Sequence, residues 1–123
     1  MRAAAAFATA VLCWIVGATP GRAIDGDTFS AVADIWPGLS ATIHVRVLGV
    51  DTPELKGETR AKAAAAKAFT EKWIDQAGGD VILTVGCGRP SLDSFGRVLA
   101  RVRTLGGKDL ADDLIAAGHG VKR

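Results

Sequence analysis

The 123-residue chain has no tyrosine, only three tryptophans and four phenylalanines, and almost no excess of charge of either sign. Its 15 basic and 13 acidic side chains give a net charge of +2, and Arg2 and Arg22 account for that excess. Residues 24–123 are therefore neutral overall. A domain that binds nucleic acid through bulk charge would be strongly basic. Any recognition of phosphate must be local, or assisted by a metal cation.

Long apolar runs are also missing, except for one at the start of the chain. Arg2 is followed by apolar residues from Ala3 to Val16 and then by small residues. This pattern predicts a signal peptide over residues 1–23, with cleavage after Ala18 or after Ala23. The run is shorter than the ~20 residues that span a bilayer, although an uncleaved anchor is the alternative. We expect a secreted or periplasmic protein with no membrane attachment once the leader has left.

Cysteine is scarce, since Cys13 and Cys87 are the only two. Cys13 lies in the predicted leader, so cleavage would leave Cys87 alone in a glycine-rich loop. A single cysteine forms neither an internal disulfide nor a cysteine-based metal site. We expect Cys87 to be unpaired, and packing, with or without a bound ion, to hold the domain together.

The remainder of the chain has the composition of one globular domain with a single modest core. Periodicity and turn residues predict two strands that form a hairpin, a long helix, two further strands and a short helix. The expected strands cover residues 27–36, 41–50, 81–85 and 97–103, and the expected helices cover residues 58–77 and 109–117. This order indicates an α+β fold, a small five-stranded barrel of the OB type with helices between and after the strands.

Three polar clusters stand out from this background. In the first, Asp25 and Asp27 flank Gly26 where the chain bends, which brings oxygen ligands together as hard cations require. Asp-Gly is also common in ordinary turns, so the cluster alone indicates only a turn. The third cluster, residues 93–97, alone indicates a turn that places Arg97 at the start of a strand.

The second cluster runs from Arg46 to Glu54. Arg46 lies on a predicted strand, and Asp51 and Glu54 lie on the loop that follows it. A half-buried arginine needs an anionic partner, which is either a structural carboxylate or the phosphate of a ligand. Glu54 could serve as a general base and Asp51 as a metal ligand. The alternative is a solvated acidic loop.

In order and spacing, the three clusters together resemble the motifs of the staphylococcal nuclease-like (thermonuclease) family. That family has an Asp-Gly-Asp-Thr turn, then Arg followed after four residues by Asp-Thr-Pro-Glu, then an Asp-x-x-Gly-Arg turn. All three are present here, and the resemblance extends from about Ile24 to Val121.

The resemblance implies a calcium site. The carboxylates of Asp27 and Asp51 and the main-chain carbonyl of Thr52 would be its ligands, and Asp25 would lie close to the metal without binding it. The implied reaction uses Glu54 to orient and deprotonate the attacking water.

Arg46 and Arg97 would hold the phosphate and neutralise the charge that grows on phosphorus. The implied protein is an exported, calcium-dependent nuclease that hydrolyses DNA and RNA with little sequence specificity and leaves 3′-phosphorylated ends. It would be a monomer without a stable protein partner. The alternative is a non-catalytic OB-type module that binds nucleic acid, and a truncated, poorly folded remnant is a third possibility.

The sequence departs from the family at three places. Ser94 and Phe95 stand where the family often has Lys-Tyr, and the tyrosines used against the nucleotide are missing. The chain stops at Arg123, where relatives continue, so the domain over residues 24–123 is expected to be C-terminally short. Cleavage after Ala23 would also remove residues that normally belong to the first strand.

Trp36 and Trp73 are expected to pack in the core or at the end of the hairpin. His44 is expected to be a surface or core histidine, with contact to the substrate as the alternative, and His119 resembles no catalytic residue.

Overall fold

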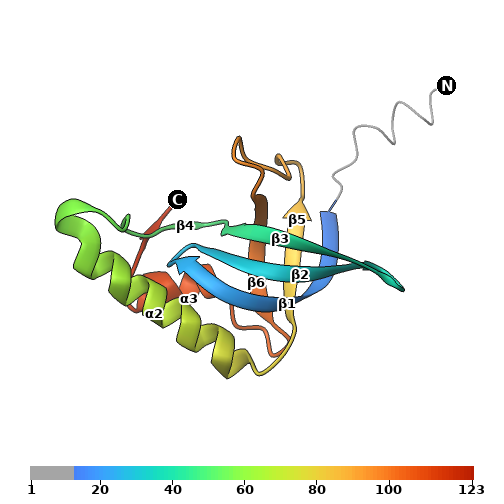
Figure 1. The fold of residues 1–123 in the computed structure, drawn as a ribbon, viewed down its shortest axis with the longest axis horizontal. Coiled ribbons are helices and arrows are strands. Elements are labelled where there is room, and N and C mark those ends of the chain that lie inside the picture. Colours follow the sequence, from blue (N-terminus) through green and yellow to red (C-terminus); the bar gives the residue numbers. More distant parts are fainter. Residues whose placement is uncertain (1–12) are drawn as a thin grey trace.

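The computed structural model describes residues 13–123 and is a mixed α+β structure (Figure 1). Its strands are β1 (Cys13–Asp25), β2 (Thr28–Trp36), β3 (Leu39–Val47), β4 (Val50–Asp51), β5 (Val81–Gly86), β6 (Val98–Thr104) and β7 (Val121–Lys122). Its helices are the short 3-10 turn η1 (Gly57–Thr59), α2 (Arg60–Ala77) and α3 (Leu110–Ala116). No helix within residues 13–123 is long and apolar enough to cross a membrane.

Five strands close into a ring in the order β1-β2-β3-β6-β5. The ring closes because the long strand β1 pairs with two partners, β5 through its first half and β2 through its second half. All neighbours are antiparallel except β3 and β6. The α+β class and a five-stranded, barrel-like arrangement are therefore confirmed.

The core is one apolar cluster that joins the ring to both helices. Phe29, Val45 and Leu83 are fully buried within it, and alternate side chains of β5 face inward. The two helices lie next to each other beside the ring (Figure 1), where Trp73 Nε1 of α2 donates a hydrogen bond of 2.8 Å to Asp113 of α3. This contact joins α2 to α3.

The strands and helices expected from the sequence are all present, with ends that move by up to three residues. The second expected strand ends at Val47 instead of residue 50, because Gly49 adopts a positive φ of 93° and turns the chain before β4. The short strands β4 and β7 were not predicted. They pair with each other, which brings the last residues of the sequence beside the loop after β3.

Residues 13–25, most of which were assigned to the leader, form β1. Both predicted cleavage points lie inside this strand, and Ala18 and Ala23 are buried. Cleavage after Ala18 would remove the segment that pairs with β5, and cleavage after Ala23 would remove nearly all of β1. Small apolar residues suit an export signal as well as the buried positions of a strand. Cleavage stays a prediction, and the rest of the expected leader lies outside the described residues.

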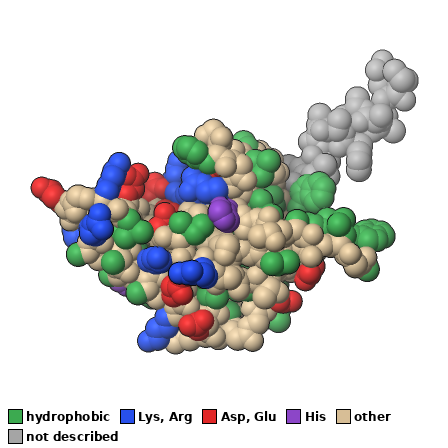
Figure 2. Space-filling view, viewed as in Figure 1, with side chains coloured by type: hydrophobic (Ala, Val, Ile, Leu, Met, Phe, Trp, Pro, Cys, Tyr) green, Lys and Arg blue, Asp and Glu red, His purple; other side chains and the backbone are tan. Residues whose placement is uncertain are grey.

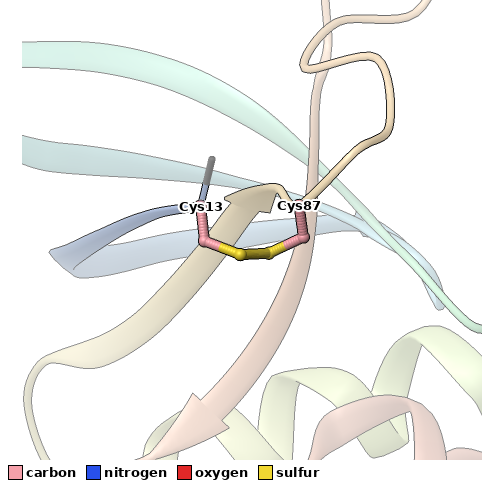
Figure 3. The surroundings of a disulfide bond; sticks show 2 residues. All are labelled: Cys13 and Cys87. Atoms are coloured by element: carbon pink, nitrogen blue, oxygen red, sulfur yellow. A yellow bond between two sulfur atoms is a disulfide. The ribbon is translucent and has the colours of Figure 1, made fainter. Parts of the chain in front are cut away.

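The expectation that Cys87 is unpaired is wrong. Cys13, the first residue of β1, and Cys87, just after β5, form a disulfide (Figure 3). Cys13 is also opposite Gly86 in the β1–β5 pairing, so strand register places the two cysteines side by side. The expectation depended on the loss of Cys13 with the leader. Where Cys13 is retained, the disulfide ties both strands together at one end of the ring.

Candidate active site

A cavity of about 340 Å³ brings the three polar clusters together. Its walls are formed by Asp25, Asp27, Arg46, Asp51, Thr52, Pro53, Glu54, Arg97 and Arg123. All six residues predicted to act in catalysis or metal binding are among them. Basic and acidic side chains crowd together around the C-terminal segment, on the side of the molecule away from the β2–β3 turn (Figure 2). Segments far apart in the sequence therefore converge on one polar site.

The turn between β1 and β2 holds Asp27 against helix α2. Thr70 of α2 donates a 2.6 Å hydrogen bond to the carbonyl oxygen of Gly26. A Cβ at Gly26 would lie only 2.7 Å from that of Ala66, so this approach requires glycine. Asp27 is 7% exposed, and its Oδ2 accepts a 3.0 Å hydrogen bond from the backbone N–H of Thr52. The turn and the loop after β4 are thus fixed relative to each other.

Arg46 is a buried cation at the centre of the site. Its Nη1 donates to the carbonyl oxygens of Val47 (2.6 Å) and Val50 (2.9 Å). Its Nη2 lies 3.4 Å from Asp27 Oδ2 and donates to Asp51 Oδ1. The anionic partners that a buried arginine needs are therefore carboxylates of this chain.

Two neighbouring carboxylates crowd negative charge into the β1–β2 turn. Asp27 N donates a 3.2 Å hydrogen bond to Asp25 Oδ1. Burial, together with the hydrogen bond and negative charge of Asp27, raises the pKa of Asp25 to about 6. Burial also opposes ionisation of Asp27, but hydrogen bonds from Asp25 and Thr52 and the charge of Arg46 outweigh it and lower its pKa.

The turn at residues 93–97 aims Arg97 at the cavity. Asp93 Oδ1 accepts 2.9 Å hydrogen bonds from the backbone N–H groups of Phe95 and Arg97, and Asp93 Oδ2 accepts from Arg97 Nε at 2.6 Å. Burial by itself raises the pKa of Asp93. The hydrogen bonds from Arg97 and Phe95 and the charge of Arg97 together outweigh this effect, so the pKa is lowered overall. Arg97 Nη1 reaches Thr28 Oγ1 at 3.2 Å. Asp93 thus holds the Arg97 side chain in position.

Glu54 lies on the exposed rim of the cavity. Its Oε2 is 3.0 Å from Lys56 Nζ, and the two side chains are 73% and 79% exposed. An ion pair this exposed contributes only about 0–1 kcal/mol. The carboxylate is therefore exposed to solvent and only weakly held by Lys56.

Arg123 belongs to the site, and sequence reasoning missed it. Its Nη1 lies 2.9 Å from Asp51 Oδ1, and its backbone N–H donates to Gly49 O at 3.3 Å. The pairing of β4 with β7 places it there. A pair of two-residue strands, with partners 70 and 72 residues apart, has no pattern in the sequence that could have revealed it.

The oxygen donors around the site fit a hard divalent cation. Asp27 and Asp51 lie against the same Arg46 nitrogen, and Thr52 Oγ1 is buried without a hydrogen-bond partner in the described part of the chain. Within residues 13–123 no three His, Cys, Asp or Glu side chains are grouped closely enough to form a metal site by themselves. A cation here would rely on two carboxylates, main-chain oxygen and water, and so would bind weakly.

No family model matches the sequence, and a search of curated proteins finds no significant relative. Function therefore has to be inferred from these residues and their geometry.

Proposed function

We propose that the chain is a member of the staphylococcal nuclease-like family, an exported calcium-dependent nuclease that hydrolyses phosphodiester bonds of DNA and RNA. The observation that carries the proposal is the convergence of three separate motifs on one cavity, with Asp27 from the first, Arg46, Asp51 and Glu54 from the second, and Arg97 from the third. If the three motifs served only as turns, their polar side chains would have no reason to line the same cavity.

The fold belongs to the same proposal. The ring of five strands, with α2 inserted between the third and fourth of them, supports assignment to the OB type. OB barrels commonly present nucleic acids to one face and its adjoining loops.

The two arginines would neutralise the phosphate. A diester carries a negative charge that repels an attacking oxygen, and further charge develops on the phosphoryl oxygens in the transition state. Arg46 approaches from β3 and Arg97 from the turn just before β6, and both are held in place by carboxylates before substrate arrives. Fixed guanidinium groups stabilise that charge without reorganising.

Glu54 would act as the general base. Its exposed carboxylate takes a proton from water as the water oxygen bonds to phosphorus and the bond from phosphorus to the leaving oxygen breaks. Asp27, Asp51 and the Thr52 carbonyl would hold calcium, which when bound supplies positive charge beside the phosphate.

Export of a form that retains Cys13 is supported by the disulfide, because such bonds persist in oxidising compartments. We infer a secreted or periplasmic location. Mass spectrometry of the native protein, with and without thiol labelling, would show whether the mature chain retains Cys13.

The decisive experiment is digestion of supercoiled plasmid and total RNA by the purified full chain, with calcium or with chelator. We expect cleavage only with calcium. Arg46→Lys and Arg97→Lys should lower activity, since an ammonium group lacks the bidentate fork of arginine. Arg60→Lys, at an exposed position on α2, is the matched control. Full cleavage in chelator would overturn the mechanism, and binding of nucleic acid without cleavage would favour the non-catalytic module.

A further inference from the structure

Two further cavities continue from the candidate active site across the surface. The first, of about 390 Å³, shares Arg46, Arg97 and Arg123 with the active-site cavity. The second, of about 460 Å³, shares Arg89 and Arg123 with the first and extends to Lys122 and α3. Because neighbouring cavities share lining residues, the three lie next to one another on the surface. We call the two outer cavities the basic track.

The basic track carries an excess of positive charge that is not used inside the protein. The cavity of about 460 Å³, which we call the outer cavity, is lined by four cations and a single acid, Asp112. Arg101 is held by Asp109 at 2.8 Å and lies 3.6 Å from Asp112, so these charges offset one another. Arg89 and Lys122 are exposed and form no ion pair with the described residues. Two cations therefore remain available for an anionic ligand.

An exposed aromatic ring stands between the active site and the outer cavity. Phe95 lines the first cavity and is 82% exposed, and the Arg97 guanidinium lies 5.4 Å from its ring centroid. Such a ring stacks on the face of an unpaired base, which a base inside a duplex cannot offer. Cations beside an exposed ring are the combination that single-stranded nucleic acids recognise.

We propose that the basic track binds a single-stranded nucleic acid on one side of the scissile bond, with Arg89 and Lys122 contacting phosphates beyond the first nucleotide. The inference rests on the proposed function, which places the reacting phosphate at Arg46 and Arg97. It assigns the preferred substrate as a strand several nucleotides long. It also accounts for a neutral domain that handles a polyanion, because two of its unpaired cations, Arg89 and Lys122, line the same cavity.

The test is binding of fluorescent oligothymidylates of two and twelve nucleotides by fluorescence anisotropy, with the full chain in chelator. The variant is Arg89→Ala with Lys122→Ala. Lys62→Ala with Lys72→Ala removes the same charge from exposed positions on α2 and serves as the control. We expect the variant to bind the twelve-mer at least about tenfold more weakly. Its affinity for the dinucleotide should change less than about twofold.

Salt dependence gives a second readout. A single-strand phosphate contact contributes about 0.7 to the slope of log affinity against log salt, so the variant should lose about 1.4 of that slope. Arg89→Lys with Lys122→Arg keeps both charges and should restore it. If the alanine variant keeps the wild-type slope and affinity, or loses no more than the control, the proposal that the basic track binds nucleic acid is wrong. If the double variant loses affinity and salt dependence as expected but the wild-type chain cleaves nothing with calcium, the proposed function fails and nucleic-acid binding by the basic track stands.

Discussion

The two ends of the strand ring are held by different interactions. At the end where β1 begins are the Cys13–Cys87 disulfide and an apolar cavity of about 280 Å³ lined by residues such as Trp14 and Val85. Cys87 also lines the outer cavity of the basic track. Exposed apolar side chains continue around the β2–β3 turn (Figure 2). At the other end, carboxylates and guanidinium groups surround Arg46. We call these the apolar end and the polar end.

The two ends are expected to have different roles, the apolar end in stability and the polar end in the proposed chemistry. The disulfide and apolar contacts stabilise the ring without offering any reactive group. Burial of the charges at the polar end costs desolvation free energy that opposes their mutual attraction, and these charges converge on the cavity proposed as the active site. We therefore expect changes at the polar end to act mainly on rate or ligand binding, and changes at the apolar end to act mainly on the free energy of unfolding.

The largest effect is expected for Glu54→Gln at the polar end. The amide keeps the shape of the side chain but cannot accept a proton, so the rate of hydrolysis should fall by about 10²–10⁴. Because the side chain is 73% exposed, thermal stability should not change. Glu58→Gln, an exposed acid in η1, is the control for lost charge. A Glu54→Gln enzyme that keeps most of its turnover would assign Glu54 to a solvated loop.

The second largest effect is expected at the apolar end. Cys13→Ser with Cys87→Ser opens a loop with a sequence separation of 74, and should lower the free energy of unfolding by about 2–5 kcal/mol. Turnover per folded molecule should remain within about twofold of wild type, because neither cysteine lines the active-site cavity. Urea titration measures the first quantity and active-site-normalised kinetics the second. Reduction of the wild-type protein should give the same loss of stability, and a collapse of turnover would show that the two ends are coupled.

The sequence revealed more of the polar end than of the apolar end, for a physical reason. Asp27, Asp51 and Arg97 each depend on a turn whose residues are adjacent in the chain. The Asp93 carboxylate, for example, is bonded to N–H groups two and four residues ahead. Such local geometry is encoded in a few consecutive residues and can be read from them.

The features that were missed all depend on pairing between distant segments. The apolar residues of β1 satisfy the pattern of an export signal as well as that of a strand, and only pairing with β5 distinguishes the two. The disulfide follows from that pairing, and the position of Arg123 follows from the pairing of β4 with β7. Single-residue patterns carry no information on which segment will be the neighbour.

A smaller effect is expected from a gain at the polar end, Ser94→Lys with Phe95→Tyr. Both residues are exposed, so the protein should tolerate the change. A new charge-assisted contact to a substrate phosphate contributes about 1.5–3 kcal/mol, which corresponds to a fall of at least about tenfold in KM. This contact lies away from the reacting phosphorus, so kcat should hardly change. Gln76→Lys, which adds the same charge on α2, is the control. If neither constant moves, another part of the surface holds the strand.

The smallest effect is expected in the pH dependence of stability, measured by urea unfolding in chelator between pH 4 and 7. Asp25 has a pKa of about 6 in the folded protein and 3.8 as its ordinary value, so the folded state binds more protons between these limits. Stability should therefore fall as the pH rises from about 4 to about 6 and then level off. The lowered pKa of Asp27 acts in a different window, since the stability it contributes is lost only as the pH falls below about 4.

Asp25→Asn should remove the decline between pH 4 and 6, because an amide does not lose a proton. The change should be modest, since Asp25 is only partly buried and solvent screens its charge. Asp80→Asn, an exposed acid just before β5, should keep the wild-type slope. An equal slope in wild type and in Asp25→Asn would show that crowding of Asp25 against Asp27 is not the source. A flatter profile would show that the polar end loses stability at neutral pH by keeping two carboxylates together, whereas the disulfide at the apolar end has no comparable dependence over this range.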